Sequence, residues 1–151
     1  MTFYSGQNGR MKIDGVNAAK VTNWSISSTQ TPLNCTTLED TDSSYINGLR
    51  NTTGSCRLFY YDDTSSTTRV NSAKTLVDKL IKARTAGSDP GKAAQPENVT
   101  LSLQVVEGTA TTREIEVEVL ITSAAMSMSV GEVLAADIAF QVNGAPLTVT
   151  L

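Results

Sequence analysis

The side chains that most often carry catalysis are missing or badly placed in this sequence. The chain has no histidine, which removes the Ser–His and Cys–His pairs that activate a nucleophile and also most protein zinc sites. Two cysteines, Cys35 and Cys56, are too few for a tetrahedral metal site. Asp62 and Asp63 could act as acid and base, but adjacent strand residues point to opposite faces of a sheet. We therefore expect no enzyme, no cofactor and no metal.

One acidic stretch begins like a calcium-binding loop. Asp40, Asp42 and Ser44 follow the D-x-D-x-S spacing of such loops. However, the sixth position holds Tyr45 where the loop needs glycine, and the twelfth holds Asn51 where a bidentate glutamate completes the ligands. We interpret this stretch as a turn-rich acidic loop.

The composition favours a β domain with one solvated face. With 151 residues the chain is long enough for one domain with a sizeable core. Serine and threonine make up about a quarter of the residues and aromatics only 5%, which suits strands with one polar face. The net charge is −3 and no basic patch is present, which argues against tight nucleic-acid binding through phosphates.

The N-terminal sequence MTFYSGQNGRMK lacks the apolar core of a signal peptide, and no apolar run reaches the length of a membrane span. We therefore expect a protein that is made in a cytosol and has no membrane partner. In that compartment Cys35 and Cys56 are most simply free thiols. A disulfide is the alternative, because the two residues flank one polar loop.

Alternating apolar and polar residues predict that most of the chain forms strands. Asp14-Gly15 and Asn143-Gly144 each predict a two-residue hairpin, because both turn positions need positive φ. Pro32 ends one strand, and a long polar loop over 40–53 separates the next two. The predicted strands after the first hairpin cover residues 20–29, 33–39, 54–61, 99–105, 113–121, 134–142 and 147–151.

One segment has helical periodicity. Apolar residues recur there on a single stripe, with lysines and an aspartate outside it. Pro90-Gly91 follows as a stop signal. We predict one helix over 71–86 that covers a sheet. The stripe consists of Ala73, Leu76, Val77, Leu80 and Ile81.

With these elements placed, the chain resembles the tail tube (major tail) proteins of long-tailed bacteriophages. The resemblance lies in the order of a short strand, a tight turn, a long strand, a long loop and a second long strand, followed by one helix and a closing hairpin. The motifs that carry it are Asp14-Gly15, the run Val21-Thr22-Asn23-Trp24-Ser25-Ile26, Thr37-Leu38-Glu39-Asp40-Thr41, Asn47-Gly48-Leu49-Arg50, Thr53-Gly54-Ser55 and Phe59-Tyr60-Tyr61-Asp62.

The resemblance implies a mainly β fold with one flanking α-helix. It implies one domain over 1–151, an antiparallel β-sandwich or barrel-like subunit that assembles into hexameric rings with a continuous inner β-barrel. Stacked rings would form a hollow tube around a tape-measure protein and would let DNA pass without specific binding. Other implied partners are the tail terminator, baseplate or tail-tip proteins and, in some tails, a sheath. The protein would reside in the virion tail, after assembly in the host cytoplasm.

The resemblance also implies two contact segments between stacked rings. The first is the N-terminal arm, residues 1–9, with Phe3 and Tyr4. The second is the loop over 40–53. Its candidate contact residues are Asp40, Asp42, Tyr45, Ile46, Leu49 and Arg50.

Three glutamates are the candidate lining of the bore. Glu114, Glu116 and Glu118 alternate with apolar residues and share one face of a predicted strand. Repeated around a ring they would repel DNA. The alternative is that they solvate an outer face of the sheet.

Two other functions are compatible with the residues. The same ring-forming fold could be the inner tube of a bacterial contractile secretion or tailocin system. The chain could also be a monomeric β-sandwich module that binds carbohydrate or protein.

Overall fold

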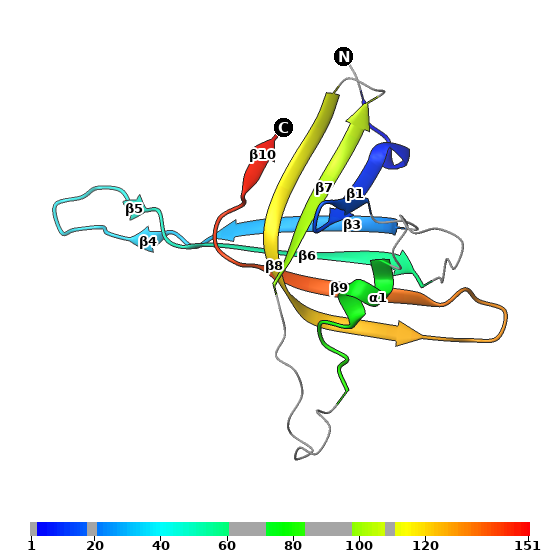
Figure 1. The fold of residues 1–151 in the computed structure, drawn as a ribbon. Helices are drawn as coiled ribbons and strands as arrows, with labels where there is room; N and C mark the ends of the chain where they lie inside the picture. The colour runs from blue at the N-terminus through cyan, green and yellow to red at the C-terminus, as the bar shows by residue number, and fades with distance from the viewer. Residues whose placement is uncertain (1–2, 18–20, 61–71, 84–97, 108–110) are drawn as a thin grey trace.

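A computed structural model of the chain describes residues 3–17, 21–60, 72–83, 98–107 and 111–151. Its main feature is an eight-stranded antiparallel sheet in the order β2-β1-β7-β8-β9-β6-β3, with β10 also paired to β8 and a separate β4-β5 pair (Figure 1). The expected mainly β architecture with one helix is confirmed. The elements are η1 (Gly6–Asn8), β1 (Gly9–Ile13), β2 (Val16–Asn17), β3 (Val21–Gln30), β4 (Leu33–Asn34), β5 (Tyr45–Ile46), β6 (Arg50–Phe59), α1 (Ser72–Val77), β7 (Val99–Glu107), β8 (Thr111–Ser127), β9 (Ala135–Val142) and β10 (Thr148–Thr150).

Strand β8 joins two parts of the sheet that run in different directions. Its first part pairs with β7 and β10, and its second part pairs with β9, with a register shift between Ile121 and Ser123. We call β2, β1, β7, residues 111–119 of β8, and β10 the glutamate half. The serine half is β3, β6, β9 and residues 120–127 of β8. Figure 1 shows β7 crossing steeply over β6 and β9.

The core lies on one face of this curled sheet. Strands β1 and β3 are far apart in the strand order yet touch each other, so the sheet closes partly on itself. Helix α1 packs on β9, β8 and β6 through Leu76 and Val77. Gly54 lets the ring of Phe140 approach the backbone, since a Cβ at this position would lie 2.5 Å from Phe140 Cζ. The largest fully buried side chains are Phe140, Met11, Leu58, Leu76, Leu101, Leu103, Ile138, Val99, Val117 and Val119.

The first predicted hairpin is confirmed. Asp14 and Gly15 have φ of 49° and 83°, and Ile13 pairs with Val16 across the turn. Only Asp14 among the described non-glycine residues has positive φ, as a turn of this type requires at its first position.

The second predicted hairpin is wrong. β10 pairs with β8 and not with β9, so the two strands follow one another along the same edge of β8. The reason is that β8 is long enough to offer a second stretch of edge. Asn143 N donates to Glu118 O (2.8 Å) and Leu147 N to Glu116 O (2.8 Å), which draws the chain along β8.

The strands around the long loop also differ from the prediction. β3 pairs directly with β6, from Val21↔Leu58 to Gln30↔Arg50, so the loop spans 31–49. The expected loop over 40–53 therefore ends too late, because residues 50–53 belong to β6. Within 33–39 only Leu33–Asn34 is a strand, since its partner is the two-residue β5.

The helix is shorter than predicted within the described residues. α1 covers Ser72–Val77, and residues 78–80 are a turn. The hydrogen bonds of Lys79 N to Leu76 O and Leu80 N to Val77 O span three residues, which tightens the chain there. Residues 71 and 84–86 of the predicted helix lie outside the described part of the chain.

Candidate assembly surfaces

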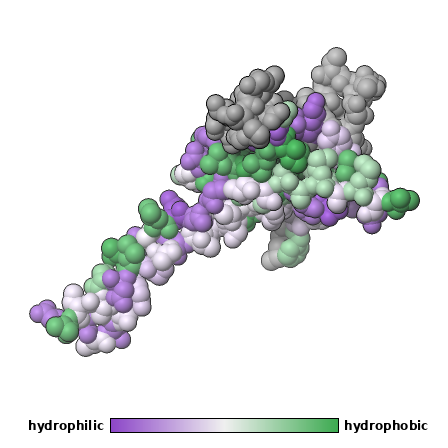
Figure 2. Space-filling view, turned by 90° about the horizontal axis from the view of Figure 1, so that it is seen from below, coloured by the Kyte–Doolittle hydropathy of each residue, from purple (hydrophilic) through white to green (hydrophobic). Residues whose placement is uncertain are grey.

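Residues 31–49 form an arm that projects away from the body of the molecule (Figures 1 and 2). It contains the short β4-β5 pair, held by Leu33↔Ile46 and Asn34↔Tyr45. At its base Gln30 Nε2 donates to Gly48 O (3.0 Å). A Cβ at Gly48 would lie 2.0 Å from Thr31 O, so only glycine allows this approach.

The arm exposes a series of large apolar side chains, visible as hydrophobic surface along the projection in Figure 2. Exposed apolar side chains gathered on one projecting segment mark an interaction surface far better than scattered ones do. They are Leu33, Leu38, Tyr45, Ile46 and Leu49.

The predicted contact residues of the loop fall into two groups. Asp42, Tyr45, Ile46 and Leu49 are exposed on the arm. Asp40 is exposed as well, but its carboxylate accepts from Thr37 N (2.7 Å) and so stabilises a local turn.

Arg50 lies apart from the arm, as the first residue of β6. Sequence reasoning missed Leu33 and Leu38, which were assigned to a strand and to no surface. The only sequence signal that could have identified these two leucines as surface residues is that each is an apolar residue isolated among polar neighbours.

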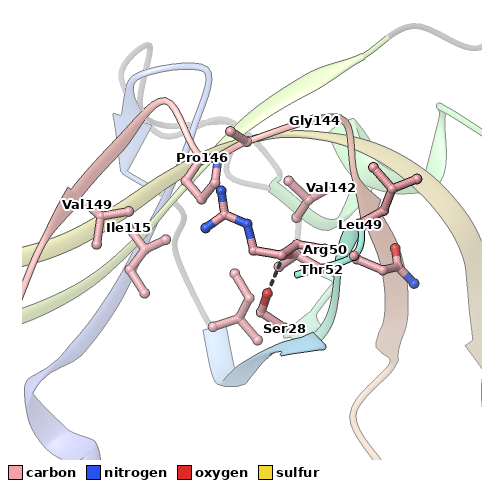
Figure 3. A pocket seen from close by; sticks show the side chains of 13 residues that line it. Ser28, Leu49, Arg50, Thr52, Ile115, Val142, Gly144, Pro146 and Val149 are labelled. Carbon is pink, nitrogen blue, oxygen red and sulfur yellow. Dashed lines mark hydrogen bonds between the residues drawn. The ribbon is translucent and has the colours of Figure 1, made fainter. Parts of the chain in front are cut away.

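Arg50 lines a pocket of about 620 Å³ at the root of the arm (Figure 3). The pocket lies where β10 and the chain before it face the start of β6 and the end of β3. Thr52 Oγ1 donates to Ser28 Oγ (2.9 Å) on its wall. Among the described residues, Arg50 is the one charged side chain that lines the pocket, so this lining holds no acid–base pair. The other lining residues are Ile26, Ser28, Gly48, Leu49, Asn51, Thr52, Ile115, Val142, Gly144, Ala145, Pro146 and Val149.

The N-terminal candidates are exposed. Phe3 is 83% exposed and Tyr4 44% exposed, ahead of the short η1 turn that leads into β1. In Figure 1 this part of the molecule lies away from the arm.

The three glutamates lie on the polar face of the glutamate half. Ser102 Oγ donates to Glu114 Oε1, and Asn98 Nδ2 donates to Glu118 Oε1. The register also places Lys12 in the row of Glu116, with Ser102 between them. In the same way Arg10 shares a row with Glu114. This face is therefore mixed in charge and not purely acidic.

The corresponding face of the serine half is built from small polar side chains. Ser25 Oγ and Ser55 Oγ are 2.9 Å apart and share a hydrogen bond. The two charged residues in these rows, Arg57 and Asp137, form an ion pair (Nη1–Oδ1 3.7 Å) and cancel. The register gives three rows across the four strands, which are polar or small except for the half-exposed Leu120 beside Gln141. They are Asn23–Arg57–Asp137–Ala125, Ser25–Ser55–Ala139–Ser123 and Ser27–Thr53–Gln141–Leu120.

Both outer edges of the serine half are unpaired within the described residues. β3 ends the strand order, and β7 pairs with β8 only up to Val119. Neither β3 nor residues 120–127 contain a charged residue or a proline. Monomeric proteins protect long edges with such residues, because bare edges pair with other chains. These two edges therefore lack the usual protection and are available to pair with a strand of another chain.

The cysteines are free, as the first of the two sequence alternatives predicted. Cys35 is exposed on the arm and Cys56 is buried in the core. Burial raises the pKa of the Cys56 thiol to about 12, with a further contribution from Asp137. Cys56 is thus a packing residue.

Two features are absent from the described residues. Nowhere in them do three or more His, Cys, Asp or Glu side chains gather in a way that could hold a metal ion. Likewise, none of the helices in this part of the chain has the length and apolar character needed to cross a membrane.

No protein-family model and no curated protein matches this sequence. Among solved structures, a chain from the virion of a native gene transfer agent (GTA) particle is similar, with a TM-score of 0.62 and 16% identity, covering 99% of this chain and 100% of that chain. A chain from the tail of an empty GTA particle, computed with helical refinement and C6 symmetry, has a TM-score of 0.62 and 15% identity, with the same coverage of both chains. The SPP1 tail tube has a TM-score of 0.65 and 13% identity, and the match covers 99% of this chain and 80% of that chain. At such identities the likeness shows the fold, and it confirms the tail tube fold that the sequence motifs predicted.

Proposed function

We propose that this chain, whose fold is that of tail tube subunits, is a structural protein of a virion tail and not an enzyme. The observation that carries the proposal is the serine half, a four-stranded unit with an arm at one end and two long edges that stay unpaired in the described part of the chain. A subunit with one bare edge on each side can repeat around a ring, because each edge then finds a partner in the next copy.

In this ring β3 of one copy pairs with residues 120–127 of β8 in its neighbour. The edges match in length, since β3 has 10 residues and the free part of β8 has eight. Six copies close the ring, following the C6 symmetry used for the tail of the GTA particle. The result is a continuous inner β-barrel to which every copy contributes four strands.

The pairing decides which face lines the bore. The core covers one face of the serine half, so the small polar face points into the barrel. Its net charge is zero, because Arg57 and Asp137 cancel, and a face of small, mostly polar side chains with no net charge neither holds nor repels passing DNA. Glu114, Glu116 and Glu118 then lie outside the barrel. This assignment replaces the glutamate lining expected from sequence.

Rings stack through the arm to make the tube. Carried over from the resemblance, the tube encloses a tape-measure protein, ends at a terminator and at baseplate or tail-tip proteins, and conducts DNA at ejection. The N-terminal Phe3 and Tyr4 are the second stacking candidates.

Disulfide trapping tests the ring. In a Cys35→Ser background, Ser25→Cys or Ser27→Cys is combined with Ser123→Cys or Ala125→Cys. The two positions are three strand spacings apart within one subunit, roughly 14 Å, which is too far for an internal disulfide. Oxidation of assembled protein should give a ladder of linked subunits that stops at a closed ring.

A matched pair on the glutamate half, Lys12→Cys with Thr148→Cys, serves as the control and should give no ladder. The ring proposal fails if none of the four combinations cross-links in particles that electron microscopy shows to be tubes. The monomeric binding module becomes the better explanation if the unmodified protein stays monomeric at high concentration.

A further inference from the structure

The hairpin between β8 and β9 is a second exposed apolar segment. Ser127 pairs with Ala135, and the connecting residues 128–134 extend beyond the sheet. Glu132 N donates to Ser129 O (3.2 Å) and Gly131 has φ of 88°, so the tip is a defined turn. Its apolar side chains are exposed, with Met128 at 77% and Val133 at 66%, and Val130 is fully exposed.

This hairpin and the arm lie at opposite ends of the serine half. β6 starts at the arm with Arg50 and ends at Phe59, which pairs with Ala135 next to the hairpin. Figure 1 shows the arm and the β8–β9 hairpin at the two extremes of the molecule, and Figure 2 shows hydrophobic surface at both. The two segments of one copy therefore cannot meet.

We infer that the β8–β9 hairpin, residues 128–134, is the docking site for the arm of a copy in the next ring. The inference rests on the proposed function. Two different patches at opposite ends of one subunit make a head-to-tail contact, which grows an open filament and leaves one patch free at each end. Exposed apolar patches that are buried on assembly explain why a single copy shows both.

Charge supports the same pairing. The arm, residues 31–49, contains Glu39, Asp40 and Asp42 and no lysine or arginine. Helix α1 and the turn after it, residues 72–83, carry three lysines and one aspartate. The hairpin itself carries one charged residue, the acidic Glu132. Since α1 packs on β9 (Figure 1), the lysines of α1 and its turn are the groups of opposite sign for an acidic arm that docks at the hairpin.

Paired substitutions test the inference. Val130→Asp places a charge on the hairpin and Leu38→Asp places one on the arm, and each should raise the critical concentration for tube growth by about tenfold or more. Val130→Ile keeps the hairpin apolar and should assemble normally. A mixture of the two aspartate variants retains one good arm and one good hairpin. The mixture should therefore form complexes of two rings but no tubes of three or more rings.

Cross-linking gives an independent measurement. In the Cys35→Ser background, Leu38→Cys and Val130→Cys should form a disulfide between subunits of adjacent rings. If Val130→Asp grows tubes at the concentration of the unmodified protein while Leu38→Asp does not, the arm docks elsewhere and the inference is wrong, although the tube function stands. If the unmodified protein forms neither rings nor tubes, the proposed function itself fails.

Discussion

Removing one carboxylate from each half of the sheet decides which face lines the bore. Asp137→Asn leaves Arg57 without its partner, so the serine half gains one positive charge per subunit. Glu116→Gln makes the same change of charge, with the same loss of a carboxylate, on the glutamate half. Both substitutions preserve the shape of the side chain, so their effects differ only through where the charge lies.

The structure sets the size of the expected effects. The Arg57–Asp137 pair is 3.7 Å long and its two side chains are 50% and 61% exposed. Exposed pairs of this kind contribute about 0–1 kcal/mol, so Asp137→Asn should leave folding and tube growth intact. DNA enclosed in the bore would instead meet one arginine per subunit. Each neutralised phosphate should add about 0.9 to the slope of log affinity against log salt.

The assay measures DNA that is trapped in tubes. Each variant is assembled with a short DNA duplex, the tubes are treated with nuclease so that DNA bound outside is destroyed, and the protected DNA is quantified at several salt concentrations. Asp137→Asn should protect more DNA than the unmodified protein at low salt and lose it as salt rises, while Glu116→Gln should behave like the unmodified protein. The opposite result, with protection by Glu116→Gln alone, would place the glutamates in the bore.

Three further predictions concern single positions. Burial raises the pKa of the Cys56 thiol to about 12, well above its ordinary value. The contribution of this thiol to stability is therefore full below about pH 9 and declines above it, so urea unfolding should show a loss of about 1 kcal/mol between pH 8 and pH 10 that Cys56→Val lacks. Gly54→Ala should cost about 1–3 kcal/mol in the same assay because its Cβ would lie 2.5 Å from both the Phe140 ring and Ser25 O, and Phe140→Leu should recover only the part of this loss that comes from the ring. Gly48→Ala should push residue 48 away from Thr31 at the base of the arm, because its Cβ would overlap Thr31 O. Limited proteolysis should then cut the arm faster, while the midpoint of urea unfolding stays unchanged.

Local patterns in the sequence predicted those parts of the fold that depend on neighbouring residues. The Asp14-Gly15 turn formed as expected, because its two residues alone supply the positive φ values. Alternation also identified the buried side of β7, β8 and β9 correctly, since Leu101, Val117 and Ile138 are fully or almost fully buried.

Features that depend on competing partners were not predictable in this way. Asn143-Gly144 carries the same turn signal, yet β10 pairs with β8 because that strand is long enough to offer more edge. The limits of the long loop were set by the register of Gln30 with Arg50, which joins residues far apart in the sequence. No local pattern records which strand wins such a competition.

The candidate bore shows the same limit in its chemistry. A row of glutamates at alternate positions stands out in a sequence, whereas a face made of serines, threonines and alanines spread over four strands does not. Whether such a face is charged depends on pairs such as Arg57 and Asp137, whose cancellation only the register of β6 with β9 brings about. A surface past which DNA must slide is better recognised by its net charge in three dimensions than by its most conspicuous side chains.

The bare edges and the apolar ends acquire a common explanation once they are considered together. A monomer with long, uncharged, unprotected edges and exposed apolar tips would be expected to aggregate. In the proposed tube every one of these features has a partner in another copy, since the edges meet around the ring and the arm meets the β8–β9 hairpin along the axis. The two sets act in perpendicular directions, so each can be disabled without the other. An edge defect should therefore abolish rings, and a tip defect should leave rings that fail to stack.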